Sequence, residues 1–115
     1  MASPPNMVPS LMKNLFNFIN EYWNKIHPLI LSSVFHYNFV FIHPFSEGNG
    51  RMARFWHTIL LSKWKELLEF IPVENQIKEY QQDYYNAIST CHINGNSNEF
   101  ISFYLKKINE ILTDL

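Results

Sequence analysis

Residues 28–54 read PLILSSVFHYNFVFIHPFSEGNGRMAR. The first part of this stretch, residues 28–42, has no charged side chain and leaves almost no polar side on a helix. A helix that is apolar all round belongs at the centre of a bundle. A buried strand is the alternative, because β-branched and aromatic residues are plentiful, but the run is long for a strand. Pro44 disfavours α geometry at His43, so we expect a buried helix that ends there.

The second part of the stretch, residues 43–54, gathers polar chemistry between apolar segments. It contains an imidazole, a carboxylate, a glycine-flanked turn and two guanidiniums. Beyond it, apolar residues return at helical spacing, so the polar residues lie between two segments that are expected to pack as helices. We therefore predict a catalytic loop between two central helices.

Apolar residues at helical spacing predict further helices on both sides of this loop. Residues 1–9 contain three prolines and are expected to be extended, with Ser10 as the N-cap of a helix that ends before Pro28. The remaining helices are expected over residues 50–64, 65–70, 74–91 and 98–112. The sequence thus predicts an all-α fold, a compact helical bundle of about five to six helices.

The composition limits the classes of protein to which the chain belongs. Its 115 residues suffice for a single domain, residues 1–115, with one modest core. Charged residues make up 17% and the net charge is −1, so we expect neither nucleic acid nor a membrane as partner. The single Cys91 excludes an internal disulfide and fits a reducing compartment. With no signal-peptide pattern at its start and no run of ~20 apolar residues, the chain is expected to be soluble and cytoplasmic; delivery into another cell stays open.

The turn Gly48-Asn49-Gly50 is the first candidate for ligand binding. Where such a turn opens a helix, free N–H groups converge and the helix dipole favours an anion, such as a phosphate; a simple turn is the alternative. Arg51 and Arg54, three residues apart, project on the same side of a helix and would grip phosphate oxygens. A solvated pair of arginines is the alternative. Together these residues favour a polyphosphate as the ligand.

Other side chains in and near this loop add to the candidate site. Glu47 suits Mg²⁺, which takes one or two carboxylates and completes its shell with phosphate oxygens and water; capping the helix is the alternative. His43 would accept a proton from an attacking hydroxyl, and a structural histidine at a helix end is the alternative. Phe45 is expected to anchor the loop in the core. His57 and His92 flank plausible nucleotide surfaces, but we interpret them as ordinary surface or core residues.

The order of these residues resembles the signature of Fic-domain proteins, H-x-F-x-(D/E)-G-N-G-R-x-x-R, and residues 43–54 fill every specified position. The likeness extends beyond this motif. Residues 27–37 resemble the run that leads into the family's active loop, and residues 4–12 resemble the segment that opens the preceding helix. Tyr84 and Tyr85 are similar to the family's downstream helix near the adenine. The resemblance therefore covers most of the chain.

The resemblance implies a protein adenylyltransferase, which moves AMP from ATP to a Ser, Thr or Tyr hydroxyl of a target protein and releases pyrophosphate. It implies that His43 is the catalytic base, that Glu47 binds Mg²⁺ or Mn²⁺, and that Phe45 anchors the loop. The implied phosphate ligands are Gly48, Asn49, Gly50, Arg51 and Arg54, with the arginines on the outer phosphates. Tyr84 and Tyr85 are possible contacts of the adenine ring, and packing in an aromatic core is the alternative.

Two devices of the family are not visible in these 115 residues: the flap that docks the target strand, and an inhibitory helix with the pattern (S/T)-x-x-x-E-(G/N). We therefore expect a catalytic core that is regulated by another segment or by an inhibitory or antitoxin partner, or one that is unregulated. A transferase of another phosphate-linked group is one alternative, although Gly50 stands where a kinase-like Doc relative usually has Lys. A non-catalytic, nucleotide-binding helical module or toxin component is the other.

Overall fold

The computed structural model describes residues 4–66, 68 and 80–113. Its elements, in chain order, are a 3₁₀ turn η1 (Pro5–Met7) and the helices α1 (Val8–Tyr22), α2 (Pro28–Ile42), α3 (Asn49–Trp64), α5 (Gln81–Asn94) and α6 (Asn98–Thr113). The described residues contain no strand, so the all-α prediction is confirmed and the strand alternative for residues 28–42 is wrong. Within these ranges, none of the helices is both long and apolar enough to cross a membrane.

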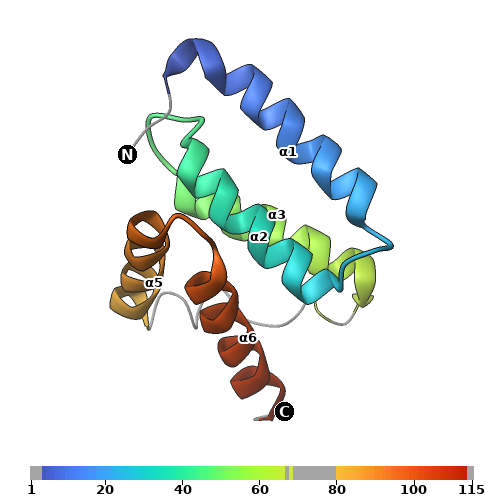
Figure 1. The fold of residues 1–115 in the computed structure, drawn as a ribbon. Helices are drawn as coiled ribbons and strands as arrows, with labels where there is room; N and C mark the ends of the chain where they lie inside the picture. Colours follow the sequence, from blue (N-terminus) through green and yellow to red (C-terminus); the bar gives the residue numbers. More distant parts are fainter. Residues whose placement is uncertain (1–3, 67, 69–79, 114–115) are drawn as a thin grey trace.

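Helix α2 is the centre of the fold. Figure 1 shows α1 on one side of the α2–α3 pair and α5 and α6 on the other. The apolar cluster shared with α1 consists of Leu15, Ile19, Leu31, Phe35, Phe39, Ile42, Ala53 and Leu60. The cluster shared with α5 and α6 consists of Tyr37, Leu61, Leu68, Tyr84, Ile88, Cys91, Phe100, Tyr104, Ile108 and Ile111. Because α2 lies between the two clusters, it needs no polar face, and its composition follows from this position.

The start of the chain differs from the prediction. Helix α1 begins at Val8, with Pro9 in its first turn, so Ser10 is not the N-cap. Proline is tolerated in a first turn because the N–H that it lacks has no partner within the helix there. Residues 5–7 form the 3₁₀ turn η1, so the extended conformation expected for residues 1–9 is wrong at these positions.

The other predicted helices agree with the structure to within a few residues where the chain is described. The bounds of α2 are those predicted, and α3 begins one residue earlier than expected, at Asn49. Helix α5 runs on to Asn94 and ends at Gly95, whose φ of 72° closes the helix in the left-handed conformation. The expected helical piece at 65–70 and the predicted helix start at 74 fall largely or wholly outside the described residues.

Candidate active site

Residues 43–48 connect α2 to α3, and the connection begins with an unusual backbone conformation at His43. His43 has φ 57° and ψ 59°, and its N–H donates to the Phe39 carbonyl at 3.0 Å. The left-handed conformation costs a non-glycine residue roughly 1–2 kcal/mol. It also turns the chain sharply out of α2 before Pro44. The imidazole is thereby placed at the rim of a pocket instead of within the helix packing.

The loop is held in shape by the side chain of Asn49. This side chain is 5% exposed; its Oδ1 accepts a hydrogen bond from the Phe45 N–H at 2.9 Å, and its Nδ2 donates to the Phe45 carbonyl at 2.7 Å. The Phe45 ring, in contrast, is 49% exposed and lies 6.3 Å from the ring of Phe39. The expectation that Phe45 anchors the loop in the core is therefore wrong. The amide of Asn49 closes the loop on the backbone of Phe45.

The start of α3 has the backbone geometry that the expected anion site requires. Gly48 has φ 78° and ψ 15°, and in the described structure no side chain caps the helix. The backbone N–H groups of Asn49, Gly50 and Arg51, in the first turn, therefore have no partner within the helix, and the helix dipole adds positive potential. Asn49 contributes to this site through its backbone N–H, because both polar atoms of its side chain bond to Phe45.

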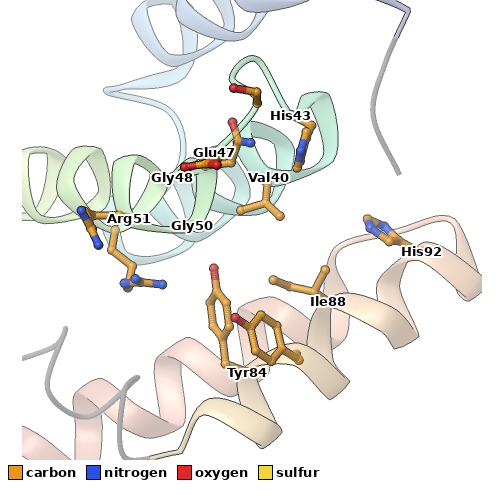
Figure 2. A pocket seen from close by; sticks show the side chains of 13 residues that line it. Val40, His43, Glu47, Gly48, Gly50, Arg51, Tyr84, Ile88 and His92 are labelled. Atoms are coloured by element: carbon orange, nitrogen blue, oxygen red, sulfur yellow. The ribbon is translucent and has the colours of Figure 1, made fainter.

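All the predicted site residues except Phe45 line one pocket of about 490 Å³. The side formed by the end of α2, the loop and α3 consists of Val40, His43, Ser46, Glu47, Gly48, Asn49, Gly50, Arg51 and Arg54. The opposite side is formed by four residues of α5, namely Tyr84, Tyr85, Ile88 and His92. Figure 2 shows His43 and Glu47 across the pocket from Tyr84, Ile88 and His92. Residues that lie far apart in the sequence thus meet here, as the family resemblance implied for Tyr84 and Tyr85 but not for Ile88 and His92.

The charges of the pocket favour an anionic ligand. Arg51 is exposed, and the partly buried Arg54 has its guanidinium carbon 5.8 Å from the centre of the Tyr84 ring. Glu47 is exposed, and among the described residues that line the pocket it is the one with a carboxylate. The described residues hold no group of three or more metal-ligating side chains, so an all-protein metal cage does not fit. A single carboxylate beside a phosphate site fits Mg²⁺, which is bound by few protein ligands together with phosphate oxygens.

The two tyrosines predicted to contact adenine differ in exposure. Tyr84 is 2% exposed, so the faces of its ring are covered and are not available for stacking with a base. Tyr85 is 53% exposed and remains the candidate for such a contact. His92, which we interpreted as an ordinary residue, lines the pocket, and the Tyr37 hydroxyl lies 2.8 Å from its Nδ1. Its spacing of eight residues from Tyr84 on one helix could have revealed this.

A buried pair of histidines lies behind the pocket. His36 is 0% exposed and His57 is 1% exposed, and their Nδ1 atoms are 3.1 Å apart. The Nε2 of His36 lies 2.7 Å from the Tyr84 hydroxyl. Burial lowers the pKa of His57 to about 3, and burial together with His57 and Arg54 lowers the pKa of His36 well below its usual value. Both side chains are therefore neutral near pH 7, and His57 is a core residue, as one of our interpretations allowed.

Comparison with known proteins adds to this geometry. A family model described as the Fic/DOC family matches residues 1–61, more than half of the chain. The chain belongs to the Fic/DOC family. A solved structure described as a Fic family protein from Desulfovibrio desulfuricans G20 superposes with a TM-score of 0.93 at 39% identity, over 99% of this chain and 34% of that one. This agreement confirms both the fold class and the resemblance found in residues 43–54.

Curated proteins that are similar in sequence to this chain are named protein adenylyltransferases. The "Protein adenylyltransferase Fic" of Drosophila willistoni is 34% identical over 77 residues, which cover 66% of this chain and 16% of the relative. The "Protein adenylyltransferase fic-1" of Caenorhabditis elegans is 26% identical over 103 residues, which cover 89% of this chain and 19% of the relative. The chain thus spans less than a fifth of the length of these two relatives. The matches support a Fic-type function at the level of the family.

Proposed function

We propose that this domain transfers AMP from ATP to a Ser, Thr or Tyr hydroxyl of a target protein and releases pyrophosphate. The observation that carries the proposal is the pocket itself. It brings together the imidazole of His43, the carboxylate of Glu47, the uncapped start of α3 and the guanidiniums of Arg51 and Arg54. Relatives named protein adenylyltransferases support the same reaction.

The phosphates would bind along the first turn of α3. The N–H groups of Asn49 and Gly50 supply donors without any side-chain rearrangement, because the loop is already fixed by the Asn49 amide. Arg51 and Arg54 would neutralise the outer phosphates. Glu47 would hold Mg²⁺ or Mn²⁺ together with phosphate oxygens, and the ion would supply further charge neutralisation.

Transfer would use His43 as the general base. Its imidazole would accept the proton of the target hydroxyl as that oxygen forms a bond to the α-phosphorus. The bond from the α-phosphorus to the oxygen that bridges to the β-phosphate breaks, and pyrophosphate leaves with the electron pair. The partial positive charge at the start of α3 stabilises the negative charge on the phosphoryl oxygens. The chain's own contribution is mainly positioning and charge neutralisation.

Gly50 supports nucleotidyl transfer over phosphate transfer. A Cβ at this position would lie 3.2 Å from Nη1 of Arg54, so a side chain there would crowd the guanidinium. The lysine usual in a kinase-like Doc relative, like any residue with a Cβ, would therefore require a small adjustment of the Arg54 guanidinium. The observed glycine leaves Arg54 in place beside the first turn of α3.

Labelled ATP tests the proposed reaction. The protein is incubated with Mg²⁺, a cell lysate and ATP labelled either on the α-phosphate or on the γ-phosphate. We expect label from the α-phosphate in protein that is lost with His43→Ala, and label from the γ-phosphate that is no greater than with His43→Ala, since kinases of the lysate contribute equally to both. Label from the γ-phosphate that depends on His43 would indicate phosphate transfer instead. Binding of ATP without transfer from either position would indicate a non-catalytic nucleotide-binding module.

A further inference from the structure

A continuous row of polar side chains runs from the core to the phosphate end of the pocket. His57 on α3 contacts His36 on α2, which contacts the Tyr84 hydroxyl on α5, and the Tyr84 ring lies beside Arg54 of α3. The two histidines and Tyr84 are each at most 2% exposed. Burying polar groups is costly unless they are paired, and here both ring nitrogens of His36 and the Tyr84 hydroxyl have partners, so the row forms a rigid buried network.

The guanidinium of Arg54 and the hydroxyl of Tyr84 both lie close to Gly50. The point where a Cβ of Gly50 would stand is 3.2 Å from Nη1 of Arg54 and 3.8 Å from the hydroxyl oxygen of Tyr84. The Nε of Arg54 is buried and has no hydrogen-bond partner among the described residues. The guanidinium thus lies beside the Tyr84 phenol, in space that a side chain at position 50 would narrow. No described carboxylate forms an ion pair with it.

The chemistry of the donors sets the direction of the hydrogen bonds. Arg54 carries only donors, so the Tyr84 oxygen can present only its lone pairs to the guanidinium. Its own proton is then directed to Nε2 of His36, 2.7 Å away. Burial raises the pKa of Tyr84 to about 12, which keeps this proton in place. His36 in turn donates from Nδ1 to His57. The row therefore holds the Tyr84 hydroxyl in one orientation toward Arg54.

We propose that Tyr84, held by His36, is a positioning residue that fixes the Arg54 guanidinium for the outermost phosphate of a bound nucleotide, and thereby makes the pocket prefer a triphosphate to a diphosphate. This inference rests on the proposed function, because it assumes that nucleotide phosphates occupy the start of α3. It gives Tyr84 a role different from the adenine contact expected from the sequence.

Binding of MgATP and MgADP to the full chain, measured by calorimetry, tests the inference. Tyr84→Phe removes only the hydroxyl and keeps the ring. We expect MgATP affinity to fall about three- to tenfold while MgADP affinity changes by less than about twofold. The matched control is Tyr80→Phe, at the exposed start of α5 and outside the pocket lining, which should change neither affinity. Melting curves check that each variant is folded.

A double-mutant cycle with Arg54→Ala separates positioning from general structure. If Tyr84 acts through Arg54, Tyr84→Phe should cause no further loss of triphosphate preference once Arg54 is removed. An equal loss of MgATP and MgADP affinity in Tyr84→Phe, or an undiminished effect in the Arg54→Ala background, would overturn the inference alone. If the unmodified protein binds neither nucleotide, the proposed function fails and the inference falls with it.

Discussion

His36 and His43 lie seven residues apart in neighbouring parts of the same chain segment, yet their surroundings differ in almost every respect. His36 is in the middle of α2, is 0% exposed and bonds to His57 and Tyr84. His43 follows the last residue of α2, has a left-handed backbone and lines the pocket. The same side chain is thus a neutral core residue in one place and a candidate base in the other.

The difference shows what decides the role of a histidine in this fold. A buried imidazole with both nitrogens occupied has no free atom for a substrate and resists protonation because burial lowers its pKa. A partly exposed imidazole at a helix end can approach a hydroxyl and exchange a proton with it.

Replacing His43 by Ala should have the largest effect, and it should be confined to activity. Loss of a general base lowers the rate of AMP transfer by about 10²- to 10⁴-fold. The melting temperature should change little, because the side chain is at the pocket rim. His27→Ala is a matched control at the opposite end of α2, where Nδ1 of His27 accepts from the Leu29 N–H at 3.1 Å. Unimpaired transfer in His43→Ala would contradict the assignment.

Replacing His36 by Leu should lower the stability of the fold. The variant leaves the buried Tyr84 hydroxyl and Nδ1 of His57 without their present partners. We expect the free energy of unfolding to fall by about 2–4 kcal/mol. Urea denaturation of the variant beside the unmodified protein measures this. An unchanged unfolding midpoint would show that the polar row is not needed for the fold.

The buried histidines also predict how stability depends on pH. In the folded protein the pKa of each of these histidines is lowered from the unfolded value of 6.5. The pKa of His57 is lowered to about 3. Below 6.5 the unfolded chain therefore binds more protons than the folded one, and the free energy of unfolding falls as the pH falls. Each histidine contributes a slope of up to about 1.4 kcal/mol per pH unit. Urea denaturation between about pH 7 and about pH 5 measures the slope, which should be shallower in His57→Phe.

Replacing Asn49 by Ala should have a smaller effect, on the loop that carries His43. The variant removes both hydrogen bonds to the Phe45 backbone, so stability should fall by about 1 kcal/mol. AMP transfer should fall more than stability suggests, because the first turn of α3 and the position of His43 both depend on the loop. Parallel transfer assays and melting curves compare the two. Phe45→Ala is the matched control, and a larger loss there would restore the aromatic ring as the anchor.

The sequence was sufficient where the pattern is local. The bounds of α2 follow from its uncharged run and from Pro44, and the motif in residues 43–54 is enough by itself to indicate the family. The sequence was insufficient where the role of a residue depends on contacts with residues far away in the chain. The contact of His36 with Tyr84 joins residues 48 positions apart, and no periodicity encodes it. The exposure of Phe45 likewise depends on how the loop closes, which the Asn49 amide decides.

A crystal structure of the protein with ATP and Mg²⁺ tests most directly whether the pocket binds a nucleotide in the orientation needed for AMP transfer. We predict that the phosphates lie along the first turn of α3, with the α-phosphorus facing the imidazole of His43 and the outermost phosphate at Arg54. Phosphates bound elsewhere, or a reversed nucleotide with its γ-phosphate facing His43, would contradict the account.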